Sequence, residues 1–258
     1  MKNASLNVDL NCDMGEVPEA IADGTQEALM RSVTSVNVAC GGHAGDEQTM
    51  KTTIEQALRW KVAIGAHPGY ADRANFGRLE LKLPPKEIAD SVFDQVCALD
   101  EVAKRCGARV VHVKPHGALY NQAVHRRDLA EAIAEGVARW RSDVVLVGLA
   151  GSPMLEVFRI AGFAVGAEAF ADRRYEPDGT LRPRKFENAL IRNPEEAARQ
   201  ALSMVERGVV IACDGTEVSV DAQTLCIHGD TPGAPEIAAM VARTLRQSGV
   251  ALGALSQP

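Results

Sequence analysis

Short apolar runs rich in β-branched residues alternate along this chain with longer stretches of helical periodicity. The runs predict strands over residues 6–11, 33–39, 62–66, 110–114, 144–149, 164–168 and 224–228. The stretches between them predict helices over residues 46–60, 85–106, 128–140, 153–161, 194–207 and 235–247. Several of these helices start at a proline and stop before a glycine, as helices tend to do. This strand–helix alternation predicts a parallel sheet covered by helices.

One segment breaks the alternation. Residues 209–213 and 216–220 flank Asp214-Gly215, a dipeptide that suits a tight type I′ turn, so they predict a β-hairpin before the last strand. Seven parallel strands remain. No long Gly/Ser/Pro-rich linker divides the chain, which predicts that residues 1–258 form a single domain.

Branched apolar residues alternate with polar, small or ionisable ones within the predicted strands. In the first strand Val8 and Leu10 share one face, whereas Asp9 and Asn11 share the other. An open sheet with helices on both sides would be apolar on both faces. The pattern therefore predicts a closed seven-stranded β/α barrel, a distorted relative of the TIM barrel, with a polar lumen.

Composition narrows the function classes. The formal net charge is -6 and no Lys/Arg block occurs, which excludes nucleic acid as a partner. No apolar run is long enough for a membrane span, and the N-terminus does not resemble a signal peptide. The six cysteines form no C-x-x-C pair, so we expect reduced thiols in a cytoplasmic protein.

Ionisable residues gather where the predicted strands end, the position at which barrel enzymes carry their active sites. Four of the six histidines lie there: His43, His67, His116 and His228. With Asp9, Asp13 and Asp230 they form a set of nitrogen and oxygen ligands that suits a divalent metal with an open position for water. Alternatively, the same groups serve as metal-free acids, bases and substrate ligands, because their spacing matches no compact metal motif.

Several residues have a simpler structural explanation. His112 and His125 are interpreted as structural histidines, and Asp46 as a helix N-cap. The glycines around His43 suit a tight turn and only weakly resemble a phosphate-binding loop. The basic run at residues 182–185 either forms a solvated loop or reaches an anionic substrate.

The strand-end motifs resemble the signatures of the LamB/YcsF family. They read D-L-N-C-D-M-G-E at 9–16, N-V-A-C-G-G-H-A-G-D at 37–46, G-A-H-P-G-Y at 65–70, V-K-P-H-G-A-L-Y at 113–120, E-A-F-A-D-R at 168–173 and C-I-H-G-D at 226–230. Asp72-Arg73 and F-G-R at 76–78 belong to the same set. The resemblance covers essentially the whole chain, and its motifs are long.

The resemblance implies a lactam-utilisation protein, the A component of prokaryotic 5-oxoprolinase. The family reaction opens 5-oxo-L-proline to L-glutamate while ATP, bound with Mg²⁺, becomes ADP and phosphate. It implies two partner chains, subunits B and C; a homo-oligomer is also compatible with the sequence. The implied fold is the seven-stranded barrel of polysaccharide deacetylases, whose metal ligands would correspond to Asp13, His43 and either His67 or His116.

Roles follow for the remaining residues as hypotheses. Asp9 or Asp13 serves as general base or metal ligand, and Lys114 with His116 stabilises an oxyanion. His228 and Asp230 form an acid/base pair. Arg73 or Arg78 binds the substrate carboxylate through a bidentate fork. The predicted substrate-binding set is completed by Asn11, Asn37, Tyr120 and Glu168.

Two other functions fit the same residues. A stand-alone metal-dependent amidase or deacetylase, acting on a small amide or an N-acetyl sugar, would need neither ATP nor partners. A non-catalytic lactam-binding subunit would only present its ligand to another chain. The crowd of ionisable residues argues against this last function, since a small ring needs few such groups for binding.

Overall fold

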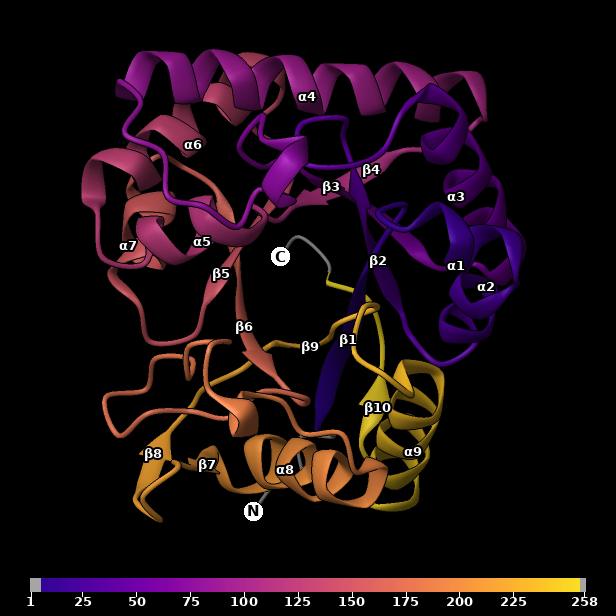
Figure 1. Cartoon of the computed structure of the whole chain (residues 1–258), viewed down its shortest axis with the longest axis vertical. Coiled ribbons are helices and arrows are strands. Elements are labelled where there is room, and N and C mark those ends of the chain that lie inside the picture. Colours follow the sequence, from indigo (N-terminus) through magenta and orange to yellow (C-terminus); the bar gives the residue numbers. More distant parts are fainter. Residues whose placement is uncertain (1–5, 256–258) are drawn as a thin grey trace.

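The computed structural model describes residues 6–255, and these form a closed parallel barrel (Figure 1). Each strand pairs in parallel with the next, and the last barrel strand returns to the first, with Asp9 opposite Thr224. The barrel strands are β1 (Asn7–Met14), β2 (Ser35–Ala39), β3 (Ala63–His67), β4 (Val110–Val113), β5 (Val145–Leu149), β6 (Ala164–Phe170) and β9 (Thr224–Ile227). The predicted fold class and seven-stranded closure are confirmed.

Helices surround the barrel on its outside (Figure 1). The predicted ones are α3 (Glu47–Trp60), α4 (Pro85–Arg105), α6 (Arg127–Trp140), α7 (Pro153–Ile160), α8 (Pro194–Arg207) and α9 (Ala234–Gln247). Asp46 caps α3 as expected: its carboxylate accepts from the Thr49 backbone, and the Thr49 hydroxyl accepts from the Asp46 backbone. The sequence did not predict the short helices α1 (Pro18–Ala22), α2 (Thr25–Met30) and α5 (Gly117–Ala123), nor the 3-10 turns η1 (Arg73–Asn75) and η2 (Glu187–Ala189).

The faces of the strands follow the predicted alternation. Val8 and Leu10 are buried in the apolar core, whereas Asp9 and Asn11 are buried among polar side chains of the lumen. The lumen is filled rather than open at the level of Gly65, where an added Cβ would lie 2.0 Å from Nε2 of His112. The polar face of each strand thus builds a packed polar interior that supports the site above it.

The predicted hairpin exists as β7 (Val209–Ile211) and β8 (Glu217–Ser219), but its turn differs from the prediction. Gly215 has φ +90°, whereas Asp214 keeps an ordinary negative φ, which excludes a type I′ turn. The Asp214 carboxylate accepts hydrogen bonds from the backbone and hydroxyl of Thr216, and Gly215 N–H donates to Ala212. The side chain of Asp214 therefore stabilises a longer turn with one left-handed glycine.

The amino ends of the strands are closed by the end of the described chain. Strand β10 (Ala251–Leu252) pairs with the first half of β1, and Leu255 then packs so closely on Gly166 that an added Cβ there would lie 2.6 Å from it. The opposite, carboxyl end of the barrel is left to form the site.

Within residues 6–255, no helix combines the length and the apolar character that a membrane crossing requires.

Candidate active site

A cavity of about 530 Å³ opens at the carboxyl ends of the strands. Its volume lies in the range of small-molecule sites. The carboxyl ends of β1, β3, β4 and β9 and the loops that follow them supply ionisable side chains to its wall: Asp13, Glu16, His67, Lys114, His116 and His228. Residues distant in the sequence thus converge here because parallel strands all end at the same rim.

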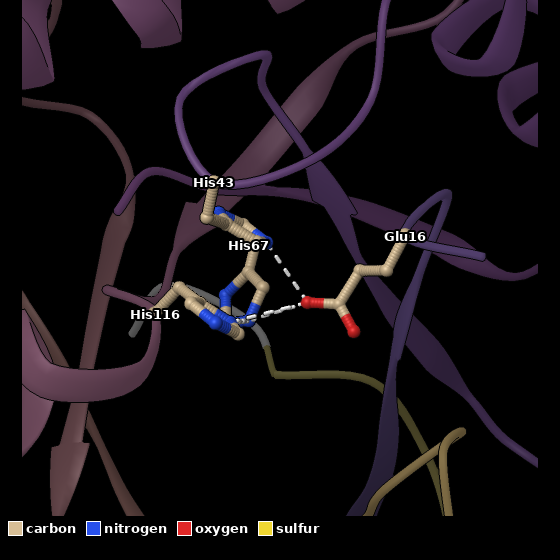
Figure 2. Close-up of side chains that lie close together, drawn as sticks. All are labelled: Glu16, His43, His67 and His116. Atoms are coloured by element: carbon tan, nitrogen blue, oxygen red, sulfur yellow. Dashed lines mark hydrogen bonds and ion pairs between the residues drawn. The ribbon is translucent and has the colours of Figure 1, made fainter. Parts of the chain in front are cut away.

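Three imidazoles and one carboxylate form the centre of this rim, which we call the histidine cluster: Glu16, His43, His67 and His116 (Figure 2). Oε1 of Glu16 lies 2.9 Å from Nε2 of His43 and 3.1 Å from Nδ1 of His116. His43 and His116 stack with ring centroids 3.6 Å apart. Asp13 adds a second carboxylate, with Oδ2 3.3 Å from Nε2 of His67.

Two backbone carbonyls fix how the imidazoles present their nitrogens. Nδ1–H of His67 donates to the carbonyl of Lys114 over 2.7 Å, and Nε2–H of His116 donates to the carbonyl of Phe76 over 2.9 Å. Their other nitrogens face each other across 3.0 Å. Two lone pairs at that distance require a shared proton or cation between them. Outer N–H groups held by carbonyls are also what orients metal-binding histidines.

Protonation in the cluster is uneven. Burial lowers the pKa of His43 to about 4, and burial also lowers the pKa of His116. Burial acts against a proton on His67 as well, but the Asp13 carboxylate outweighs it and raises the pKa of His67. Burial would raise the pKa of Glu16, yet the neighbouring imidazoles of His116 and His43 hold it below its usual value. A proton on His67 therefore occupies the place that a cation would take.

The donor set fits a divalent transition metal. Imidazole nitrogens with one or two carboxylates are typical ligands of Zn²⁺ and related ions. Nδ1 of His43 is buried without a partner among the described residues, so Glu16 is the one hydrogen-bond partner of this imidazole there. The cluster and the adjacent Asp13 thus bring together the sequence-predicted ligands Asp13, His43, His67 and His116.

Lys114 lies below the cluster in a buried ion-pair network. Its ammonium is 2.9 Å from Oδ1 of Asp13, 2.9 Å from Oε1 of Glu168 and 3.1 Å from Sγ of Cys226. Burial works against the charged form, but Asp13 and its other partners raise the pKa of Lys114 well above its usual value. Its three protons are thus already engaged, which suits positioning of carboxylates better than the expected binding of an oxyanion.

His228 is paired with a motif residue to which the sequence analysis gave no role. Nδ1 of His228 lies 3.0 Å from Oδ1 of Asp172, and the same carboxylate accepts from the His228 backbone and from the Thr231 hydroxyl. The expected pairing of His228 with Asp230 does not form, because Asp230 binds Arg78 and Arg184 instead. A carboxylate that orients an imidazole is a common acid/base arrangement.

Other predicted residues lie outside the cavity wall. Asp9 sits deep in the lumen, bound by hydroxyls that include those of Ser35 and Thr224, so its position supports no catalytic role. Asn11 and Asn37 hydrogen-bond to each other within the same polar interior. Arg73 donates to the carbonyls of Gly41 and Gly45 and does not line the cavity.

Arg78 and Tyr120 do line the cavity. The Tyr120 hydroxyl and Oε2 of Glu168 are buried and, among residues 6–255, make no hydrogen bond. Burial, followed by the nearby Glu168 carboxylate, raises the pKa of Tyr120 well above its usual value. Glu168 is fully buried and does not line the cavity, so of these two atoms only the Tyr120 hydroxyl belongs to a residue of the cavity wall.

Glu16 is the main residue that the sequence reasoning missed as a ligand. It stood inside the first strand-end motif, but no spacing rule distinguishes it from a loop residue. Gly15, with φ +75°, turns the chain after β1 so that Glu16 faces the histidines.

Comparison with known proteins identifies the family of this chain. The LamB/YcsF family matches residues 8–258. This chain belongs to the LamB/YcsF family. A relative from Methylococcus capsulatus, named as the A component of 5-oxoprolinase, is 48% identical over 248 residues, which is 96% of this chain and 95% of the relative. The family predicted from the strand-end motifs is confirmed.

Solved structures agree as well. The lactam utilization protein from Thermus thermophilus is 44% identical, with a TM-score of 0.89 over 96% of this chain and 100% of that one. The catalytic domain of a peptidoglycan N-acetylglucosamine deacetylase from Eubacterium rectale is 11% identical, with a TM-score of 0.51 over 100% of this chain and 93% of that one. This second likeness concerns the fold alone.

Proposed function

We propose that this chain is the A component of an ATP-dependent 5-oxoprolinase and takes part in opening 5-oxo-L-proline to L-glutamate. The full-length similarity to a relative named as that component carries the proposal. ATP with Mg²⁺ is the co-substrate, and subunits B and C are the partner chains. All six cysteines are free, which fits the reducing cytoplasm.

The chemistry explains why ATP is needed. An unstrained five-membered lactam is a poor electrophile, and the opened product closes again readily. Transfer of the γ-phosphoryl group of ATP to the amide oxygen would convert that oxygen into a leaving group. Water then adds to the same carbon, and the C–N bond breaks as a proton is delivered to the ring nitrogen, which leaves an acyl phosphate. A second water hydrolyses this acyl phosphate to the carboxylate and releases phosphate; both steps require a positioned acid/base group.

The histidine cluster, together with Asp13, would hold a divalent metal in this proposal. Such an ion, when bound, polarises a carbonyl or phosphoryl oxygen and lowers the pKa of water. The contribution of the chain is to fix the ligands: the carbonyls of Lys114 and Phe76 orient two imidazoles, and Lys114 keeps Asp13 ionised. Burial raises the pKa of Asp13, but His67 and then Lys114 outweigh it.

His228 moves the proton in this proposal. Asp172 holds its Nδ1, which leaves Nε2 to exchange a proton with the substrate nitrogen or with water. A ring nitrogen of His228 lies within 4.8 Å of an Asp13 oxygen, so the acid/base group adjoins the ligand set. The Tyr120 hydroxyl, which has no hydrogen-bond partner among the described residues, supplies a donor for the amide of the lactam.

The test mixes the purified chain with 5-oxo-L-proline and ATP-Mg²⁺, with and without subunits B and C, and measures glutamate and ADP. We expect both products only in the complete mixture. Glu16→Gln should lower the rate by at least tenfold, whereas the exposed Glu55→Gln, whose carboxylate only pairs with Lys51, should not.

Other outcomes select the alternatives. Hydrolysis of amides or N-acetyl groups by the chain alone, without ATP, would make it a stand-alone amidase or deacetylase. Tight binding of 5-oxo-L-proline with product formation indifferent to Glu16 and His228 would make it a lactam-binding subunit. No glutamate in any mixture would refute the proposal.

A further inference from the structure

One buried cation at the cavity has no anionic partner. Arg173 follows β6, is only 6% exposed and lines the cavity wall. Its Nη2 donates to the backbone carbonyl of Arg182 over 2.7 Å, and its Nε is buried without a hydrogen-bond partner in the described chain. Among residues 6–255, no carboxylate lies within 4.0 Å of its guanidinium, so nothing of this chain neutralises it directly.

The neighbouring arginines are different. Arg78 and Arg184 both reach the cavity but share the carboxylate of Asp230, at 2.5 Å and 3.1 Å. Arg174, the next residue along the chain, pairs with Glu196 at 2.7 Å. Arg173 is thus the arginine of this wall that is left for a ligand.

The unpaired charge is costly to bury. A buried charge without a partner loses its hydration and gains nothing in return, so such groups are usually paired or neutralised. Burial and the nearby Arg184 lower the pKa of Arg173 to about 10, which still leaves the guanidinium protonated at neutral pH. A ligand that brings its own carboxylate would supply the missing partner, and a guanidinium binds a carboxylate through two parallel hydrogen bonds.

We propose that Arg173 binds the carboxylate of the ligand in this cavity, so that the site selects small carboxylated amides over neutral ones. Phe170 and Leu181 line the same cavity and offer apolar contact for ring carbons. Phe170 also stacks on His228, with ring centroids 5.3 Å apart, so the side of the cavity that carries Phe170 and Arg173 contacts the acid/base group. In naming 5-oxo-L-proline as this ligand, the inference rests on the proposed function.

A matched pair of lactams tests the inference. 2-Pyrrolidinone is 5-oxo-L-proline without its carboxylate. Calorimetric titration of the full chain should show that wild type prefers the carboxylated lactam. Arg173→Met should lower the affinity for 5-oxo-L-proline by about 10- to 150-fold, which is the effect of losing hydrogen bonds to a charged group. The affinity for 2-pyrrolidinone should stay unchanged. Arg174→Met is the control and should alter neither affinity, because Arg174 is occupied by Glu196.

Three results would overturn the inference: unchanged binding of 5-oxo-L-proline by Arg173→Met, equal weakening of both lactams, or no binding of 5-oxo-L-proline by wild type. Equal weakening would indicate a structural role. Arg173→Lys keeps the charge but cannot form two parallel hydrogen bonds, so this variant should bind 5-oxo-L-proline with intermediate affinity. It serves as the test if Arg173→Met does not fold.

The activity assay separates this inference from the proposed function. In the complete mixture, Arg173→Met should raise KM for 5-oxo-L-proline far more than it lowers kcat. If binding of 5-oxo-L-proline depends on Arg173 but no glutamate forms, the proposed activity is refuted and the carboxylate-binding role of Arg173 stands. Normal glutamate formation with an unchanged KM would keep the activity and refute the site.

Discussion

Replacing Lys114 by methionine should destabilise the fold strongly, because the lysine is 3% exposed and compensates two buried carboxylates. At an effective dielectric constant of about 20, two unit charges 2.9 Å apart attract by about 6 kcal/mol. Most of that attraction offsets the loss of hydration. Removal of one member of a buried pair typically costs about 3–5 kcal/mol, since the remaining charge is uncompensated.

The expected free-energy change is measurable by urea denaturation and by thermal melting. For a chain of 258 residues, about 1 kcal/mol corresponds to about 2 °C, so the melting temperature should fall by about 6–10 °C. Lys51→Met is the control: this lysine pairs with Glu55, both side chains are more than half exposed, and its loss should cost less than about 1 kcal/mol.

The loss should also depend on pH with a definite sign. Burial alone raises the pKa of Asp13, and in wild type His67 and Lys114 reverse this. Without Lys114 the pKa of Asp13 in the folded variant rises relative to wild type, although His67 still lowers it. The destabilisation comes from the ionised carboxylate, so it should shrink as the pH falls through that pKa and Asp13 takes up a proton. A destabilisation below about 1 kcal/mol, or one independent of pH, would refute this account of the network.

Further predictions concern the site. Dialysis against a chelator should lower the melting temperature, and metal at about 100 times its Kd should restore about 2.7 kcal/mol of stability. If neither treatment changes the stability, the metal site is refuted. Gly77→Ala should abolish metal binding measured by elemental analysis, because its Cβ would lie 2.8 Å from that of His43 at φ +62°, whereas Gly107→Ala, at φ +71° in open space, should retain it. Asp172→Asn should lower kcat by about 10²–10⁴-fold while circular dichroism stays unchanged, since it removes the carboxylate that orients His228; near-normal turnover would exclude that role.

Much of the fold follows from two-residue periodicity. Six of the seven barrel strands lie within two residues of their predicted bounds at either end, because β-branched runs bounded by turns leave little choice. The exception is β1, which continues to Met14 instead of ending at Asn11. Residues 11–14 alternate polar and apolar, so the strand carries Asp13 on the same lumen face as Asp9. The sequence assigned this stretch to a loop because of its polar members.

The site was predictable in composition but not in pairing. Strand ends located His43, His67 and His116, since all parallel strands finish at one rim. The sequence does not reveal which carboxylate reaches which cation: Glu16 was missed, and Arg73 and Arg78 were favoured for a substrate carboxylate although each already has partners. Pairings of this kind depend on loop conformation, which has no periodic signal.

Closure of the barrel has a consequence for biosynthesis. Asp9, near the start of the described chain, bonds across 215 positions to Thr224 in β9, and β10 follows later still. A nascent chain that has emerged only as far as α8 carries two unpaired strand edges, on β1 and on β6. Open edges of this kind favour pairing with other chains. At about 5–20 residues per second, this exposed interval lasts several seconds, so translation pauses before β9 should promote aggregation during expression.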